Sequence, residues 1–226
     1  MKHRNAFFLF WHENAFFLWG FALVFAAGLL CFFYIQQGAE ILFFSNRRSA
    51  FGDFFFKYFT RMGEGILFLL AFLAFLLIRY RTAIYIPLLG ITVMLLSVLS
   101  KNWFAQPRPY RYFEELNRLD QLTFVEGVYV NKGLSSFPSG HTMAAFALYA
   151  FLAFVAPSKK SLALLLLLIA VLVGISRIYL VQHFLQDVLS GGFLGVLLAV
   201  FYYYLHQRYP KQAWADQSLL NRGNRA

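Results

Sequence analysis

Three short polar groups interrupt a strongly hydrophobic chain, and each carries residues that could bind or transfer a phosphate. The first, KNWFAQPRP, contains Lys101 and Arg108. The second is PSGH, residues 138–141, and the third is SRIYLVQHFLQD, residues 176–187. Arginine presents a planar fork of donors that matches two oxygens of a phosphate. Cations gathered in this way predict an anion site.

PSGH stands where a long apolar run begins. Serine is a favoured N-cap, so Ser139 predicts the start of a helix. The N–H groups of Gly140 and His141 would then be free, at the positive end of the helix dipole. Glycine also lets the backbone approach an anion closely. We therefore expect this helix N-terminus to bind phosphate.

Two of the five histidines of the chain belong to these groups. His183 and Asp187 are four residues apart and would share one face of a helix. The carboxylate could accept the proton of one ring nitrogen and leave the other nitrogen as a nucleophile. His141 could then protonate a leaving oxygen.

The elements that must position these residues are predicted to be membrane helices. The chain has 226 residues, of which 60% are hydrophobic and 13% are charged, whereas a soluble domain carries about 25% charged residues. A spanning helix needs about 20 apolar residues, with polar residues at its ends in the interface. An all-α bundle of six transmembrane helices is predicted from six uncharged runs: 15–37, 66–78, 83–100, 142–157, 161–176 and 188–205.

Six spans place both termini on one side, and basic residues in short segments mark the cytoplasmic side. The basic residues of that side are Lys2, Arg4, Arg79, Arg81, Lys159, Lys160, Arg208, Lys211, Arg222 and Arg225. All three polar groups then lie on the opposite, external face. The first external segment, residues 37–63, departs from this rule because it contains Arg47, Arg48, Lys57 and Arg61. Residues 51–63 within it predict an amphipathic helix at the interface.

A single integral-membrane domain is expected over residues 1–210, with its core at 83–205 and a polar tail at 211–226. The net charge of +10 is explained by orientation and anionic lipid rather than by nucleic acid. The single cysteine, Cys31, excludes a disulfide within the chain. The oligomeric state stays open.

Two further features have local interpretations. Gly191 and Gly195 form a GxxxG pattern in the last run, which predicts tight helix packing. Ser176 could bond phosphate or could hold Arg177, and the sequence leaves both possibilities open.

The order KX6RP, PSGH, SRX5HX3D on a six-span layout resembles the type 2 phosphatidic acid phosphatase (PAP2) superfamily, and every motif position matches. The resemblance implies that His183 attacks phosphorus to form a phosphohistidine, that Asp187 orients it, and that His141 is the general acid. It implies a set of phosphate-binding residues that stabilise the transition state: Lys101, Arg108, Ser139, Gly140 and Arg177. It implies no cofactor and no metal. The acidic residues of the long external loop also lack the spacing of a metal site.

The expected function is a lipid phosphatase of the bacterial inner membrane, with cytoplasmic termini and a periplasmic active site. Similar proteins act on undecaprenyl diphosphate, phosphatidylglycerol phosphate, phosphatidate or lipid A phosphates, and the loop 110–136 is expected to help select among them. One alternative is a phosphotransferase that passes the phosphate to a lipid hydroxyl. A transporter or a catalytically silent lipid-binding protein is another, although the spans carry no charge and the motif set is complete. Haloperoxidases share the motifs but are soluble.

Overall fold

The computed structural model describes residues 6–156, 160–208, 215 and 217–220, which form helices and loops without any strand. The predicted all-α class is confirmed. The helices are α1 (Ala6–Glu13), α2 (Ala15–Tyr34), α3 (Ala39–Ser45), α4 (Ala50–Phe59), η1 (Thr60–Gly63), α5 (Ile66–Ile78), α6 (Tyr80–Phe104), α7 (Pro109–Glu115), η2 (Leu119–Gln121), α8 (Gly140–Val155), α9 (Lys160–Tyr179) and α10 (Leu185–Arg208).

Each of the six predicted runs forms a helix, but their lengths make the span count approximate. Four stretches of the described chain are long and apolar enough to cross a membrane: α2, α6 with α7, α9 and α10. A fifth would be α4–η1 together with α5, which are bent by 58°. α8 has 16 residues, or about 24 Å at 1.5 Å per residue, and the hydrocarbon layer is about 30 Å thick. Its shortness fits a helix whose start lies within the polar site.

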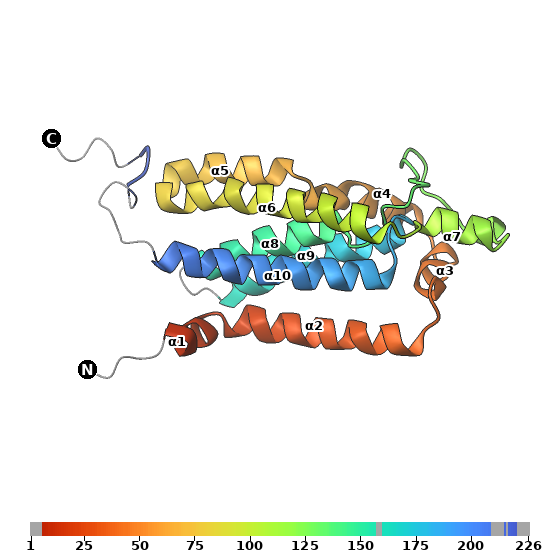
Figure 1. Ribbon diagram of the computed structural model, residues 1–226, viewed down its shortest axis with the longest axis horizontal. Helices are drawn as coiled ribbons and strands as arrows, with labels where there is room; N and C mark the ends of the chain where they lie inside the picture. The colour runs from red at the N-terminus through yellow and green to blue at the C-terminus, as the bar shows by residue number, and fades with distance from the viewer. Residues whose placement is uncertain (1–5, 157–159, 209–214, 216, 221–226) are drawn as a thin grey trace.

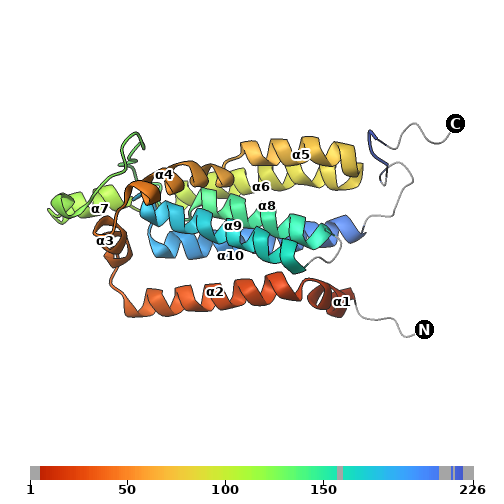
Figure 2. The same ribbon diagram turned by 180° about the vertical axis from the view of Figure 1, so that it is seen from behind.

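α8 forms the centre of the bundle, and α6, α9 and α10 pack around it (Figure 1). Large side chains such as Met143 and Phe151 on α8 are fully buried. α2 lies along the outside in both views (Figures 1 and 2), and Phe17 and Leu18 are its buried residues. Its outward side chains are as apolar as the buried ones, with Phe33 76% exposed. A helix that is apolar all round suits contact with lipid.

The GxxxG residues bring the backbones of α10 and α8 together. A Cβ atom added to Gly191 would lie 2.6 Å from the carbonyl oxygen of Ser139, and one added to Gly195 would lie 2.6 Å from that of Met143. Side chains at these positions would therefore collide with main-chain atoms, so the predicted tight packing is confirmed. The contact at Gly191 also fixes the start of α8 against α10.

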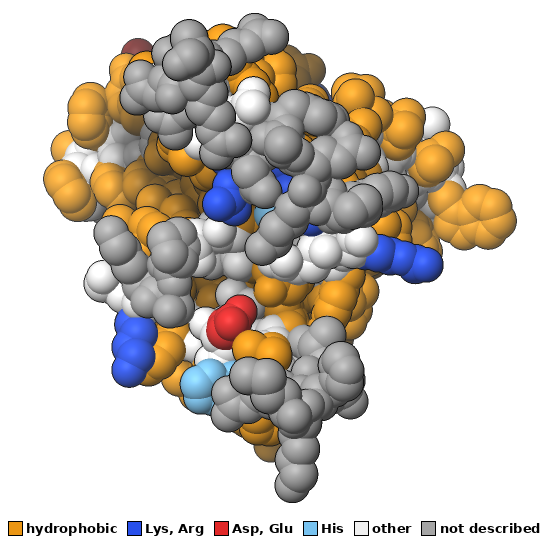
Figure 3. Space-filling model, turned by 90° about the vertical axis from the view of Figure 1, so that its left-hand side faces the viewer, with side chains coloured by type: hydrophobic (Ala, Val, Ile, Leu, Met, Phe, Trp, Pro, Cys, Tyr) orange, Lys and Arg blue, Asp and Glu red, His pale blue; other side chains and the backbone are white. Residues whose placement is uncertain are grey.

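The two ends of the bundle differ. α1, the α5–α6 junction, the start of α9 and the end of α10 lie at one end, while α3, α4 and α7 lie at the other (Figures 1 and 2). Lysine and arginine side chains appear among hydrophobic ones on the first end (Figure 3). Arg79, Arg81, Lys160 and Arg208 belong to segments of that end, as predicted. Other residues of the charge argument lie outside the described residues: Lys2, Arg4, Lys159, Lys211, Arg222, Arg225 and most of the tail 211–226.

The predicted amphipathic segment 51–63 is helical. Ser49 caps α4 by accepting a hydrogen bond from the N–H of Gly52 at 3.1 Å. Phe51 and Phe54 are 77% and 65% exposed. The 58° bend sets α4–η1 apart from α5, as a helix in the interface would require. Its placement in the interface stays a prediction.

Candidate active site

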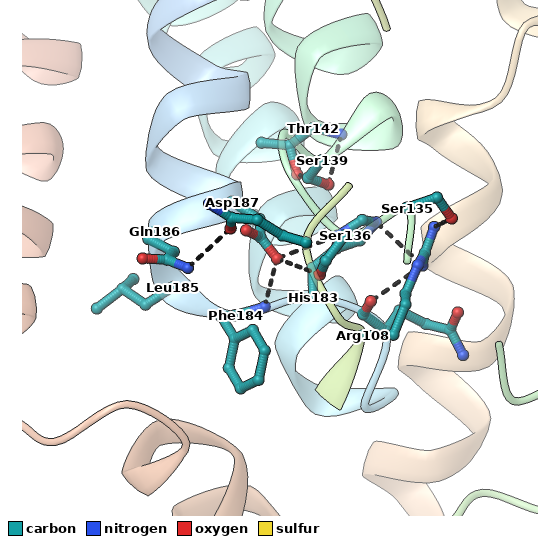
Figure 4. Close-up of polar contacts among 12 residues, drawn as sticks. Arg108, Ser135, Ser136, Ser139, Thr142, His183, Phe184, Leu185, Gln186 and Asp187 are labelled. Atoms are coloured by element: carbon teal, nitrogen blue, oxygen red, sulfur yellow. Dashed lines mark hydrogen bonds and ion pairs between the residues drawn. The ribbon is translucent and has the colours of Figure 1, made fainter. Parts of the chain in front are cut away.

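The PSGH residues form the start of α8, and Ser139 is its N-cap. Its hydroxyl accepts a hydrogen bond from the N–H of Thr142 at 3.4 Å and lies 2.8 Å from the hydroxyl of Thr142. Its own N–H donates to the main-chain carbonyl of Asp187 at 2.9 Å. Both hydroxyl side chains are fully buried and turned toward each other (Figure 4). The predicted cap is confirmed, and it is tied directly to the segment that carries Asp187.

The carboxylate of Asp187 is held from two directions (Figure 4). Its Oδ2 accepts a hydrogen bond from the hydroxyl of Ser136 at 2.6 Å and another from the N–H of Phe184 at 2.9 Å. Asp187 and Ser136 are both fully buried. Because buried carboxylates need such partners, these bonds fix the carboxylate beside His183.

His183 lies between this carboxylate and an arginine. Its Nδ1 is 3.4 Å from Oδ2 of Asp187, and its Nε2 is 3.4 Å from a terminal nitrogen of Arg108. The tautomer with its proton on Nδ1 suits both contacts, because it leaves the lone pair of Nε2 facing the arginine. The side chain is 2% exposed. Burial, and next the positive charges of Arg108, Arg177 and Lys101, lower the pKa of His183 well below its usual value. The imidazole is therefore neutral near pH 7, the state that a nucleophile requires.

Arg108 follows the end of α6. Ala105 ends that helix in a left-handed conformation with φ 43°, which turns the chain back toward the site. A terminal nitrogen of Arg108 donates to the carbonyl of Gln182 at 3.0 Å. Its Nε is buried without a partner among the described residues. This donor remains available to an anion.

Arg177 shares this property. One terminal nitrogen donates to the hydroxyl of Thr60 at 2.7 Å, while its Nε is buried without a partner among the described residues. Its carbonyl accepts hydrogen bonds from the N–H groups of Gln182 and His183, at 2.9 Å and 3.2 Å. Arg177 therefore shapes the turn that presents His183.

Lys101 completes the cationic group at the end of α6. A Cβ atom added to Gly140 would lie 3.5 Å from its Nζ, so the ammonium group sits beside the first residue of α8. Lys101, Arg108 and Arg177 are close enough to interact electrostatically. Three buried or half-buried cations repel one another unless an anion lies among them. The structure thus brings the three predicted cations to one place.

His141, in the first turn of α8, lines a cavity of about 460 Å³ between η1, α5, α6 and α8. Gly140 and Ser97 also line the cavity. The charges of Arg177, Lys101 and Arg108 act on His141. All eight residues that the motifs single out thus gather at the end of the bundle away from α1.

The hydroxyl of Ser176 donates to the carbonyl of Val173 at 2.6 Å, within its own helix, and forms no hydrogen bond with Arg177 among the described residues. A bond from Ser176 to phosphate stays a prediction. No group of three or more histidine, cysteine or acidic side chains with the geometry of a metal site occurs in the described part of the chain.

Three contributors to the site escaped the sequence analysis. Ser136 holds Asp187, and Thr60 holds Arg177. Glu40 on α3 accepts a hydrogen bond from the N–H of Leu185 at 3.0 Å, at the start of α10. Ser136 lies two residues before PSGH, so a search of the motif's neighbours could have found it. Thr60 and Glu40 are more than 100 residues away from their partners in the sequence, and no local pattern marks them.

Comparison with known proteins assigns this chain to a family. The sequence profile of the PAP2 superfamily matches residues 81–211, more than half of the chain. The chain belongs to the PAP2 superfamily. The matched residues include all of the motif positions and, apart from the first residue of α6, the helices α6 to α10.

Curated relatives of this PAP2 chain include phosphatidylglycerophosphatase B of Bacillus subtilis, 38% identical over 47% of this chain and 49% of the relative. Another is probable lipid phosphate phosphatase 4 of Arabidopsis thaliana, 35% identical over 39% of this chain and 33% of the relative. Each match thus spans less than half of the relative's length.

Solved structures share the fold over more of the chain. The phosphatidylglycerolphosphate phosphatase of Bacillus subtilis has a TM-score of 0.63 at 26% identity, covering 89% of this chain and 98% of that one. Aquifex aeolicus LpxE has a TM-score of 0.65 at 24% identity, covering 76% and 96%. Together with its apolar helices, this similarity makes the PAP2 chain a multi-pass membrane protein.

Proposed function

We propose that this protein is a membrane lipid phosphatase that works through a phosphohistidine on His183. The observation that carries the proposal is the buried His183–Asp187 pair beside arginines whose Nε donors have no partner in the described structure. A phosphate among these cations would accept the unused donors and relieve the repulsion between the charges. The curated relatives that carry phosphatase names support the same activity.

In the first step, Nε2 of His183 attacks phosphorus while the bond to the lipid oxygen breaks. Asp187, whose Oδ2 lies 3.4 Å from Nδ1 of His183, stabilises the positive ring. His141 gives its proton to the leaving oxygen, and the bound phosphate, which neutralises the cationic group, favours the protonated imidazole that this transfer needs. Water then gives a proton to His141 and attacks the phosphohistidine, which restores both histidines and releases inorganic phosphate.

The phosphate is held by the remaining motif residues. Lys101, Arg108 and Arg177 neutralise the charge that grows on the equatorial oxygens. The N–H groups at the start of α8, from Gly140 onward, add donors at the positive end of the helix. Ser139 contributes by capping that helix, because its hydroxyl is engaged with Thr142.

The substrate belongs to the lipid phosphates, with phosphatidylglycerol phosphate, phosphatidate, undecaprenyl diphosphate and lipid A phosphates as the members to compare. Because basic residues favour the cytoplasmic side, we infer that the other end of the bundle is cytoplasmic and that the site faces the periplasm of a bacterial inner membrane. A reporter fused after Arg225 should then behave as cytoplasmic.

Phosphate release tests the proposal. Purified full-length protein in detergent, with EDTA present, should release inorganic phosphate from at least one of these four lipids. His183→Ala should reduce the rate by about 10³-fold or more, whereas His12→Ala, an exposed histidine at the far end of the bundle, should match the wild type. No release from any of the lipids would contradict the proposal. A phosphorylated acceptor lipid in place of free phosphate would instead identify a phosphotransferase.

A further inference from the structure

The cavity beside His141 has a polar end and an apolar end. Ser97 and His141 line the polar end, while Ile91 and Met94 on α6 line the apolar end. Ile91 and Met94 are 51% and 57% exposed, so the apolar end opens on the outer surface of the bundle. From Ser97 to Ile91 the helix advances about 9 Å. This shape suits a lipid whose polar atoms reach His141 and whose chain stays at the bundle surface.

The two histidines of the proposed mechanism differ in their position relative to this cavity. His141 lines the cavity, whereas the nucleophile of the proposed function, His183, is not among the described lining residues. In an in-line displacement the nucleophile and the leaving group lie on opposite sides of phosphorus. The leaving group therefore occupies the cavity, next to the residue proposed to protonate it.

One acidic side chain, Glu64, stands among the described residues that line this cavity. Its neighbour Gly63 packs against His141, because a Cβ atom added there would lie 2.7 Å from the carbonyl oxygen of His141. Glu64 is half-buried, and its charge interacts with that of Arg177. Its carboxylate forms no hydrogen bond or ion pair with any described residue. A carboxylate here shares the cavity with His141, the residue proposed to protonate the leaving group.

We propose that Glu64 makes the enzyme select phosphate monoesters of lipid alcohols over lipid diphosphates. This inference rests on the proposed phosphatase function. With a monoester, the leaving group is an alcohol, uncharged once His141 has protonated it, and any neighbouring hydroxyl can donate to Glu64. With a diphosphate, the leaving group is a lipid monophosphate, whose negative charge lies beside the Glu64 carboxylate. In a partly desolvated cavity this like-charge contact is costly.

The chemistry balances in the same way for both substrates. The bond from Nε2 of His183 to phosphorus forms, the bond from phosphorus to the leaving oxygen breaks, and water later releases inorganic phosphate. Glu64 exchanges no proton in this sequence and acts as a specificity-determining residue. Its removal should therefore change the preference between substrates more than the rate with the preferred one.

Farnesyl monophosphate and farnesyl diphosphate form a matched pair, because they share one chain and differ by the second phosphate. We expect wild-type protein in detergent to have the higher kcat/KM for the monophosphate. Glu64→Gln should raise the ratio of diphosphate to monophosphate kcat/KM by roughly tenfold, and Glu64→Asp should stay near the wild-type ratio. Glu13→Gln, which removes the same charge from an exposed position in α1 at the other end of the bundle, should leave the ratio unchanged.

An unchanged ratio in an active Glu64→Gln variant would overturn the inference, and so would an equal loss of activity with both substrates. A wild-type preference for the diphosphate would overturn it as well. None of these results would contradict the proposed phosphatase activity itself. Absence of phosphate release from both substrates and from the four lipids named above would instead refute the proposed function.

Discussion

The hydroxyl of Ser136 lies 2.6 Å from Oδ2 of Asp187 and joins two parts of the chain that are 51 residues apart. A second bond, from the N–H of Ser139 to the carbonyl of Asp187, runs beside it. The loop that starts α8 and the turn that starts α10 are therefore one unit. The position of His183 relative to the helix N-terminus depends on this unit rather than on either segment alone.

Ser136→Ala should lower kcat/KM for a lipid phosphate by about tenfold, because it removes one of the two hydrogen bonds that hold the buried carboxylate. The smaller side chain fits the same space, so the fold should persist. Steady-state phosphate release measures the effect. Ser135→Ala is the matched neighbour. Among the described residues, the Ser135 hydroxyl accepts only a long contact of 3.4 Å from Arg108, and its loss should cost less than about threefold. Equal effects of the two substitutions would contradict this role of Ser136.

The lowered pKa of His183 has a consequence for stability. Burial, followed by the charges of Arg108, Arg177 and Lys101, keeps the folded-state pKa well below the value of about 6.5 that the unfolded chain has. Below pH 6.5 the unfolded state thus binds a proton that the folded state does not, so stability falls as the pH falls. Above pH 6.5 neither state binds the proton and the contribution of His183 is constant.

We therefore expect the thermal unfolding midpoint of the wild type in phosphate-free detergent to drop between pH 6.5 and pH 5.5. The drop should be smaller in His183→Gln. In terms of the free energy of unfolding, the difference should be up to about 1.4 kcal/mol per pH unit. His12→Gln, an exposed change in α1, should retain the pH dependence of the wild type. If His183→Gln retains it too, the histidine is not held neutral by its surroundings.

Gly195→Ala should destabilise the bundle by about 1–3 kcal/mol, because the added methyl would meet the main chain of α8. The nearest main-chain atoms would be the Met143 carbonyl oxygen at 2.6 Å and the Ala147 nitrogen at 2.9 Å. Gly65→Ala is a suitable control, since a Cβ atom at that position meets nothing within 4 Å. The comparison of thermal midpoints in detergent tests the prediction. A Gly195→Ala midpoint equal to that of Gly65→Ala would show that α8 and α10 can separate without cost.

The local features of the fold could be predicted from the sequence. Uncharged apolar runs mark the helices because lipid and protein interior both select apolar side chains, and Ser139 marks the start of α8 because a helix N-terminus needs an acceptor. The exact helix ends and the number of full membrane spans were harder to predict from the sequence. α8 is short, and α5 continues α4–η1 across a bend of 58°. Both departures depend on how the site packs.

The residues proposed to do the chemistry occur at recognisable motif spacings. The residues that hold them in place do not. His183 and Asp187 lie four residues apart, so helix geometry predicts that they meet. Thr60, which bonds Arg177, comes from a segment 117 residues away, and only the packing of η1 against α9 brings it there. Glu64 reaches the cavity by the same packing. Contacts of this kind follow from tertiary structure, and a single sequence carries no periodic signal for them.

The central claim is that His183 carries the phosphate during turnover. Rapid mixing of the protein with phosphatidate labelled in its phosphate, followed by an alkaline quench, tests it most directly. We expect label on the wild-type chain within the first turnover, stable to alkali, lost in acid, and located on the peptide that contains His183. His183→Ala should carry no label and release no phosphate. Label on any other residue, or phosphate release by His183→Ala at the wild-type rate, would contradict the mechanism.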